Sequence, residues 1–234
     1  MAYGFQVLNN NGEIVLDDTS SPIRVVSTRT VAGIAPPAGR FTIRTPVGLK
    51  QFNVGVQANT NFIFFQVPVG ATVGTANGRQ FFGYNINNLN VRECAVFTDN
   101  LPALEGWGMR IYDPGGSNIL YTSEGVLNPI NRIVSSGEGD SINTPANVMY
   151  PYHNVGADDT WFCVSLSRTG FVCFLTQQQS GFQEGAFWSL CGSVSRISST
   201  QIQSSRIEYA DWGAPFALDV GYEKVTSGRI IIGK

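Results

Sequence analysis

A short segment that occurs twice constrains this chain more than any other feature. Residues 2–17 read AYGFQVLNNNGEIVLD, and residues 106–121 read GWGMRIYDPGGSNILY. In both copies an aromatic residue and a glycine precede alternating apolar and polar residues, a turn that contains glycine, and a returning apolar run. The copies start 104 residues apart, at Tyr3 and Trp107, and the second has one extra residue after the turn. We therefore expect a duplicated structural element.

Each copy has the pattern of a β-hairpin. Side chains of a strand point alternately to opposite faces, which places Phe5 and Val7 on one face, and Met109 and Ile111 on one face of the second copy. Any two hairpins share part of this pattern, but the leading aromatic-Gly pair is not needed for a generic hairpin. The turns hold residues that tolerate positive φ, namely Asn10-Asn11-Gly12 and Pro114-Gly115-Gly116.

The first copy also carries a family resemblance. The segment YGFQVLNNNGEIVLDD, followed by IRVV, resembles the opening of a family of small bacteriophage tail proteins, and residues 106–122 share that likeness. Members begin with an aromatic-Gly-apolar-Gln-Val segment, an Asn/Gly turn and a returning strand that ends in Asp, and some repeat the module in mid-chain. The resemblance implies a structural role in the virion, near the tail tip, the baseplate or the tail fibres. It supplies no catalytic residues.

The rest of the sequence predicts an all-β protein. Short apolar or alternating segments are separated by Gly, Asn and Pro, and 26 of the 234 residues are glycine, which suits many strands and tight turns. The run Phe62–Phe65 is apolar on both faces and predicts a central strand, whereas residues 70–78 read as a turn between strands. No segment has the pattern of a helix longer than two turns.

The repeat divides the sequence into two halves. We predict two tandem, related β-sandwich-like modules, residues 1–103 and residues 104–234, joined at a turn-rich segment. In the second module, residues 160–166 and 170–176 read as one hairpin. Residues 136–159 have no period, and a loop of that length inside a compact domain is often functional.

The cysteines indicate buried thiols rather than a metal site. They lack the close paired spacing of a zinc site, and we expect them to be reduced. A disulfide between Cys163 and Cys173 is the alternative, because the hairpin of residues 160–176 would place these two opposite each other. The four positions are Cys94, Cys163, Cys173 and Cys191.

Charge and hydropathy exclude several classes of partner. Charged residues make up 14% of the chain and the net charge is −2, so there is no broad cationic field for nucleic acid phosphates. No basic segment followed by an apolar core opens the sequence, and no apolar run reaches the ~18 residues that span a bilayer. We expect a homo-oligomer that is made in the host cytoplasm and assembles with other phage tail proteins, without a nucleic acid partner or membrane insertion.

Few residues suit catalysis. A Ser-His-Asp or Cys-His arrangement needs a base that titrates near neutrality, and His153 is the only histidine. Paired carboxylates could serve glycoside hydrolysis or ligate Ca²⁺, although no EF-hand pattern occurs. We expect a protein that is not an enzyme and binds no cofactor or metal. The carboxylates that bracket the long loop are Glu138, Asp140, Asp158 and Asp159.

The long loop offers the best candidates for contact with another molecule. An aromatic face beside hydrogen-bonding groups suits sugar rings and protein partners alike. The sequence therefore favours a structural tail protein, with a carbohydrate-binding module that recognises host surface glycans or proteins as the alternative. An envelope-polymer hydrolase is the least supported function. The predicted contact residues are Tyr150, Tyr152, His153, Asp158 and Asp159.

Overall fold

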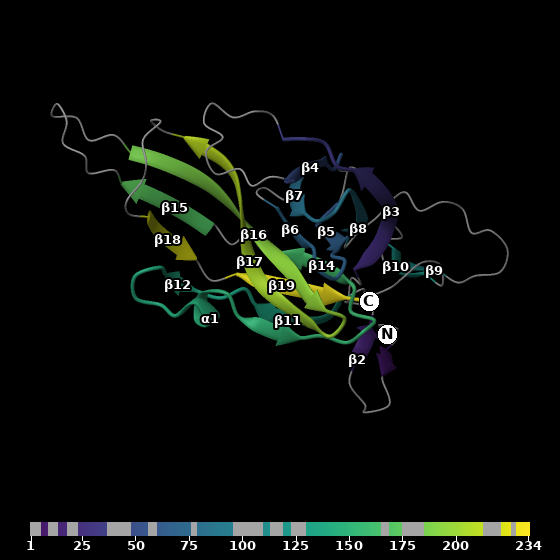
Figure 1. The fold of residues 1–234 in the computed structure, drawn as a ribbon. Coiled ribbons are helices and arrows are strands. Elements are labelled where there is room, and N and C mark those ends of the chain that lie inside the picture. Colours follow the sequence, from purple (N-terminus) through teal and green to yellow (C-terminus); the bar gives the residue numbers. More distant parts are fainter. Residues whose placement is uncertain are drawn as a thin grey trace, which may run out of the picture. The chain divides into compact units, whose positions relative to one another are not determined.

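A computed structural model describes a nearly all-β protein (Figure 1). Among the described residues there are nineteen strands and a single helix, α1 (Ala146–Met149), which confirms the predicted fold class. No helix in this part of the chain is long and apolar enough to cross a membrane. The described residues are 6–8, 14–17, 23–36, 48–55, 60–75, 79–95, 110–112, 119–122, 130–164, 169–174, 185–212, 221–225 and 228–234.

Both copies of the repeated segment form hairpins. β1 (Gln6–Leu8) pairs antiparallel with β2 (Ile14–Asp17), and β9 (Arg110–Tyr112) pairs antiparallel with β10 (Ile119–Thr122). The strands begin and end at equivalent positions of the two copies. Each pair is a two-stranded sheet of its own.

The pairing register is also the same in the two hairpins. In each one the register shifts after two pairs, and the shift passes over the equivalent positions Val15 and Leu120. A shared irregularity at one position is not a general property of hairpins. Both segments therefore form the predicted hairpin, and the two hairpins match in register. The pairs in β1–β2 are Gln6 with Asp17, Val7 with Leu16, and Leu8 with Ile14. The equivalent pairs in β9–β10, in the same order, are Arg110 with Thr122, Ile111 with Tyr121, and Tyr112 with Ile119.

A six-stranded sheet combines strands from both halves of the sequence. Its β5 strand lies between two neighbours and buries Ile63, Phe64 and Phe65. Consecutive residues of a strand face opposite sides, so both faces of this strand are covered, and the predicted central strand is confirmed. The order in the sheet is β11 (Ile130–Ser135), β19 (Arg229–Gly233), β14 (Trp161–Val164), β5 (Phe62–Gln66), β8 (Asn88–Ala95) and β3 (Arg24–Ala32).

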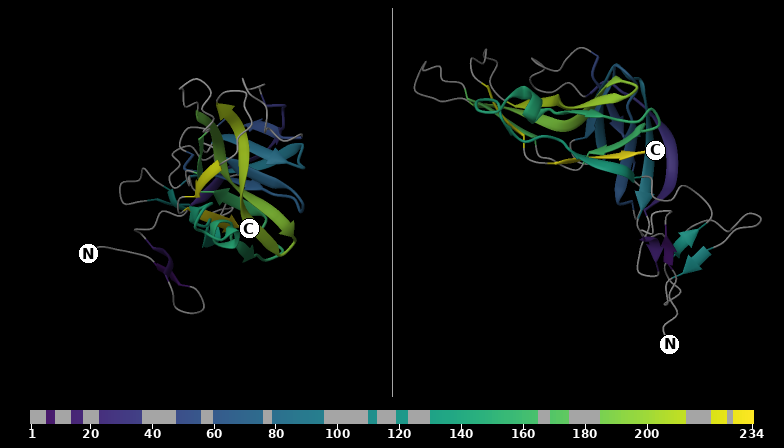
Figure 2. Two further views of the ribbon diagram at one scale, coloured as in Figure 1. Left: turned by 60° about the vertical axis from the view of Figure 1, so that its left-hand side comes forward. Right: turned by 90° about the horizontal axis from the view of Figure 1, so that it is seen from below.

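A nine-stranded sheet contains the longest strands. The yellow-green strands β16 (Gly185–Ser198) and β17 (Gln201–Trp212) lie side by side (Figures 1 and 2), and β17 also pairs with β13 (Tyr152–Asn154). The path through the sheet runs β12 (Gly139–Asp140), β18 (Gly221–Val225), β15 (Thr169–Phe174), β16, β6 (Thr72–Thr75), β7 (Gln80–Tyr84) and β4 (Lys50–Asn53).

Two sheets pack through aromatic side chains. The ring of Phe65 on β5 meets that of Phe81 on β7 edge to face, with centroids 5.4 Å apart, and both side chains are buried. Such a pair adds about 0.5–1.5 kcal/mol to the stabilisation that burial alone gives. The next residue, Phe82, lies in a second cluster with Leu49 and Ile207. β7 is therefore covered on both faces.

The two predicted tandem modules are not confirmed. β5 pairs with β14, and β6 pairs with β16, so strands from both sides of residue 104 share the same sheets. By backbone contacts the chain divides into two discontinuous units: unit 1 holds residues 1–28, 56–63 and 92–129, and unit 2 holds residues 29–55, 64–91 and 130–234. Both hairpins belong to unit 1. The predicted boundary between residues 103 and 104 lies outside the described residues.

Three local predictions are wrong. Residues 160–166 and 170–176 do not form one hairpin, because β14 and β15 belong to different sheets. Cys163 lies opposite Ile231 and carries a reduced, buried thiol, while Cys173 lies opposite Ala186, so the alternative disulfide is not formed. The turn predicted for residues 70–78 contains β6.

Candidate functional site

The predicted contact segment is not a structureless loop. Residues 136–159 contain β12, helix α1 and β13. The helix starts after Pro145 and ends before Pro151, because the residue that precedes a proline is disfavoured in the α-helical region. β13 follows directly and pairs with β17, with Tyr152 opposite Gln203 and His153 opposite Ile202.

His153 holds β13 against a neighbouring strand. Its Nε2 atom lies 2.8 Å from the backbone oxygen of Ser135, at the end of β11. A carbonyl oxygen can only accept a hydrogen bond, so the imidazole donates from Nε2. The structure therefore gives the only histidine of the chain a bond to the backbone, and a partner would meet a side chain that is already engaged.

Ser204 on β17 bonds to the backbone of this segment at Ser136 and at Pro151. The Ser204 hydroxyl donates to the Ser136 oxygen at 2.6 Å, and the Ser204 N–H donates to the Pro151 oxygen at 2.9 Å. Gly137 adopts φ +91°, and a Cβ there would overlap the Met149 carbonyl oxygen. This close approach leaves room only for glycine.

The two predicted tyrosines occupy different environments. Tyr152 is 53% exposed on β13, so its ring can meet another molecule. Tyr150 is half-buried, and its hydroxyl is buried without a hydrogen-bond partner among the described residues. The structure therefore offers one of the pair as a surface contact and places the polar end of the other inside.

The adjacent carboxylates Asp158 and Asp159 are also separated by the fold. Asp158 is exposed, whereas Asp159 is 3% exposed. One oxygen of Asp159 accepts from Asn131 Nδ2 at 2.7 Å, and the other accepts from the Gly156 N–H at 2.8 Å. Asp159 thus closes its own turn and joins it to β11, so it lies inside the protein and not on a contact surface.

The remaining predicted carboxylates, Asp140 and Glu138, have different surroundings. Asp140 accepts hydrogen bonds from the N–H groups of Asn143 at 2.7 Å and Ile142 at 3.0 Å. These bonds, that of Asn143 first, lower the pKa of Asp140, while a general acid needs a raised pKa. Glu138 is exposed. In the described ranges no three His, Cys, Asp or Glu residues gather as metal ligands.

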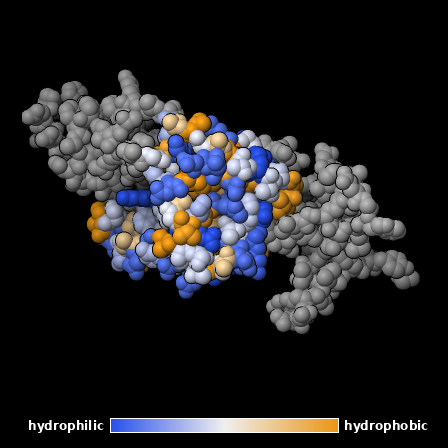
Figure 3. All heavy atoms as spheres, turned by 45° about the vertical axis from the view of Figure 1, so that its right-hand side comes forward, coloured by the Kyte–Doolittle hydropathy of each residue, from blue (hydrophilic) through white to orange (hydrophobic). Residues whose placement is uncertain are grey.

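Exposed apolar residues accompany Tyr152 along the same part of the chain. Ile133 on β11 is 55% exposed, Ile142 is 71% exposed, and Val148 on α1 is 49% exposed. On the face drawn in Figure 3, hydrophobic residues form several separate patches between hydrophilic ones. Separate patches of this kind are ordinary on a protein surface. The exposed apolar residues therefore do not by themselves define a contact surface around Tyr152.

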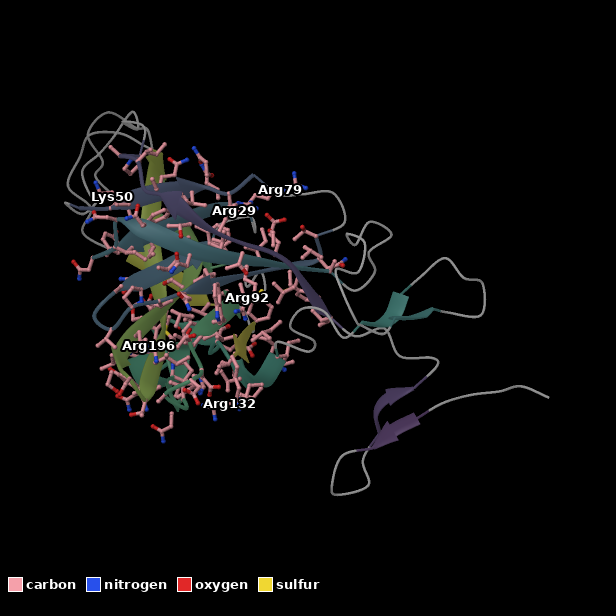
Figure 4. All side chains as sticks on the ribbon, turned by 90° about the vertical axis from the view of Figure 1, so that its right-hand side faces the viewer. Arg29, Lys50, Arg79, Arg92, Arg132 and Arg196 are labelled. Atoms are coloured by element: carbon pink, nitrogen blue, oxygen red, sulfur yellow. The ribbon has the colours of Figure 1, made fainter. Side chains whose placement is uncertain are left out.

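The cationic side chains labelled in unit 2 come from several strands (Figure 4). Within unit 2, Arg132 on β11 and Lys50 on β4 lie well apart (Figure 4). Arg132 is exposed, while Arg196 is buried. Arg132 and Lys50 therefore do not belong to one cationic patch.

Arg196 is a buried charge that the sequence did not single out. Its guanidinium donates to the backbone oxygens of Ser198 at 3.3 Å and Ser199 at 2.9 Å, and it lies 6.0 Å from the ring centre of Phe162. Burial lowers the pKa of Arg196, and the charge of Asp159 opposes that effect. A serine-rich strand gives no sequence signal for such a residue.

Glu93 is a second buried ionisable residue that was missed, and here a signal existed. Glu93 is fully buried in β8, where one carboxylate oxygen accepts from the Thr60 hydroxyl at 2.6 Å. Val91, Glu93 and Ala95 alternate in the sequence and share one buried face. An acidic residue in an apolar period-two series indicates a buried, bonded carboxylate.

Comparison with known proteins adds no further constraint on this site. No family model, curated protein or solved structure matches the chain. The functional argument therefore depends on the residues and the fold described above.

Proposed function

We propose that this chain is a structural component of a bacteriophage tail, in the region of the tail tip, baseplate or tail fibres. The observation that carries the proposal is the duplicated hairpin, with the same strand bounds and the same register shift in β1–β2 and β9–β10. The first hairpin is the segment that resembles small phage tail proteins. A repeated β-element suits a protein that fits against several neighbours.

The strand edges support an assembly role. β11 and β3 end the six-stranded sheet, and β13 has one paired side among the described strands. Edges of this kind pair readily with another chain. The four carboxylates that were candidates for catalysis include one that is buried, Asp159, and one with a lowered pKa, Asp140, and neither state favours an acid–base pair.

The direct test is location in the particle. Phage particles are purified from cells that carry the gene, and gold-labelled antibodies against the chain are imaged by negative-stain electron microscopy. We expect label at one position on the tail. Particles that contain every other tail protein but no label, together with a purified chain that stays monomeric, would exclude the proposal.

Host attachment through a surface glycan is a second candidate function. It is favoured by Tyr152, a 53% exposed ring on a strand whose neighbour Asn154 is also exposed, because aromatic faces beside amides suit sugar rings. Tyr152→Ala should reduce binding to host cells or lipopolysaccharide. The matched control is Tyr150→Phe, which removes a buried hydroxyl without a partner and should leave binding and stability unchanged. Equal binding by both variants would confine the protein to assembly.

A further inference from the structure

Each hairpin has two outer edges that no other described strand covers. Among the described strands, β1 and β2 pair only with each other, and so do β9 and β10. An isolated two-stranded hairpin is marginally stable at best in water, and its outer edges present N–H and C=O groups to further strands. Each hairpin is therefore suited to extension by strands from another source.

The shared register shows how one hairpin can extend the other. β9 is the counterpart of β1, and β1 lies antiparallel to β2. β9 can pair with the outer edge of β2 in the same register that β1 has on the inner edge. In that arrangement Asp17 lies opposite Arg110 and Leu16 lies opposite Ile111. The result is a four-stranded antiparallel sheet in the order β1-β2-β9-β10, with both turns at the same end.

Charge selects this edge over the other one. The β2–β9 arrangement sets the carboxylate residue Asp17 opposite the guanidinium residue Arg110, at the pair farthest from the turns. The other arrangement, β1 beside β10, sets Gln6 opposite Thr122, and both are neutral. Opposite charges directly across two strands stabilise a sheet, and like charges destabilise it. In each hairpin one member of this pair is charged, Asp17 on β2 and Arg110 on β9, and the other member is neutral.

We propose that β2 of one copy of this chain pairs with β9 of the next copy. The occupant is a second copy because within one chain the two hairpins form separate sheets. Each copy then offers one edge and accepts another, so the contact is heterologous and repeats around a ring or along a fibre. The inference deepens the assembly role proposed above, on which it rests, by naming the contact that joins the copies.

Charge reversal in the full-length chain tests the pairing. Asp17→Arg gives a chain with two basic positions, and Arg110→Asp gives a chain with two acidic positions. Each variant alone should associate about tenfold more weakly than the wild type in sedimentation velocity, because a facing pair of opposite charges becomes a pair of like charges. High salt should reduce the difference, since salt screens the interaction between charges.

Mixing the two single variants distinguishes contact between copies from contact within one chain. In an equimolar mixture, every β2 edge of one variant meets an oppositely charged β9 edge of the other, and association should return to within about twofold of the wild type. The double variant D17R/R110D should recover alone. Recovery by the double variant without recovery in the mixture would show pairing within one chain and overturn the proposal.

Further outcomes separate this proposal from the assembly role. If both single variants associate as strongly as the wild type, the hairpin contact is refuted while the assembly role stands. A wild-type chain that stays monomeric also refutes the contact, and labelling of particles then decides the assembly role separately. Circular dichroism checks that each variant folds, and D17K with R110E carries the same test if a reversal does not fold.

Discussion

Replacing Asp159 by alanine tests whether this carboxylate stabilises the interior rather than binding a partner. The variant removes the acceptor of two hydrogen bonds, from Asn131 Nδ2 and from the Gly156 N–H. It also removes the negative charge that acts on the buried Arg196. Hydrogen bonds to a charged group contribute about 1.5–3 kcal/mol each. Because Asn131 is exposed, water can replace part of its bond, so we expect a total loss of about 3 kcal/mol.

The neighbouring residue provides the matched control. Asp158 is exposed, and Asp158→Ala should change the free energy of unfolding by no more than about 0.5 kcal/mol. Urea unfolding, followed by tryptophan fluorescence and far-UV circular dichroism, gives both values. For a chain of this size a loss of 3 kcal/mol corresponds to a fall of about 6–12 °C in Tm. If the two variants unfold at the same urea concentration, the structural role assigned to Asp159 is wrong.

Three further changes have definite expected outcomes. Gly137→Ala should cost about 2–4 kcal/mol in urea unfolding, because φ is +91° and the new Cβ overlaps a carbonyl oxygen; a cost under about 0.5 kcal/mol would contradict that geometry. Phe65→Ala should cost about 3–5 kcal/mol, whereas Val69→Ala, at a 60% exposed position, should cost little; similar values would argue against the packing of the two sheets. Asp140→Ala should lose stability relative to the wild type above pH 3.8, and this difference should vanish as the pH falls through the lowered pKa of Asp140; a difference that persists in acid would exclude the carboxylate as its source.

The local sequence pattern predicted where strands occur better than it predicted which strands pair with each other. The hairpins were predictable because turn and strands lie within a few residues of each other. The central strand β5 was predictable because both its faces are apolar. The pairing of β5 with β14 joins residues about a hundred positions apart, and no periodicity records such a choice. β6 was missed because Gly74 interrupts its pattern, yet a Cβ there would meet the backbone of β16, a close approach that requires glycine.

The candidate site was predictable only in part. The sequence located the segment that exposes Tyr152, but it could not separate Asp158 from Asp159, since two identical neighbours differ only in which side of the chain they occupy. The hydrogen bond of His153 and the burial of Arg196 depend on strands that meet only in the folded chain. Glu93 was the exception, because its alternation with apolar residues is visible in the sequence.

The central claim is that this chain is a structural component of a phage tail. The most direct test is the number of copies of the chain in each purified phage particle, measured by quantitative mass spectrometry against an isotope-labelled standard. An assembly component should be present at one fixed ratio to the other tail proteins in every preparation, and that ratio should match the rotational symmetry of the tail. A chain that is lost during purification, or whose ratio varies between preparations, would contradict a structural role in the virion.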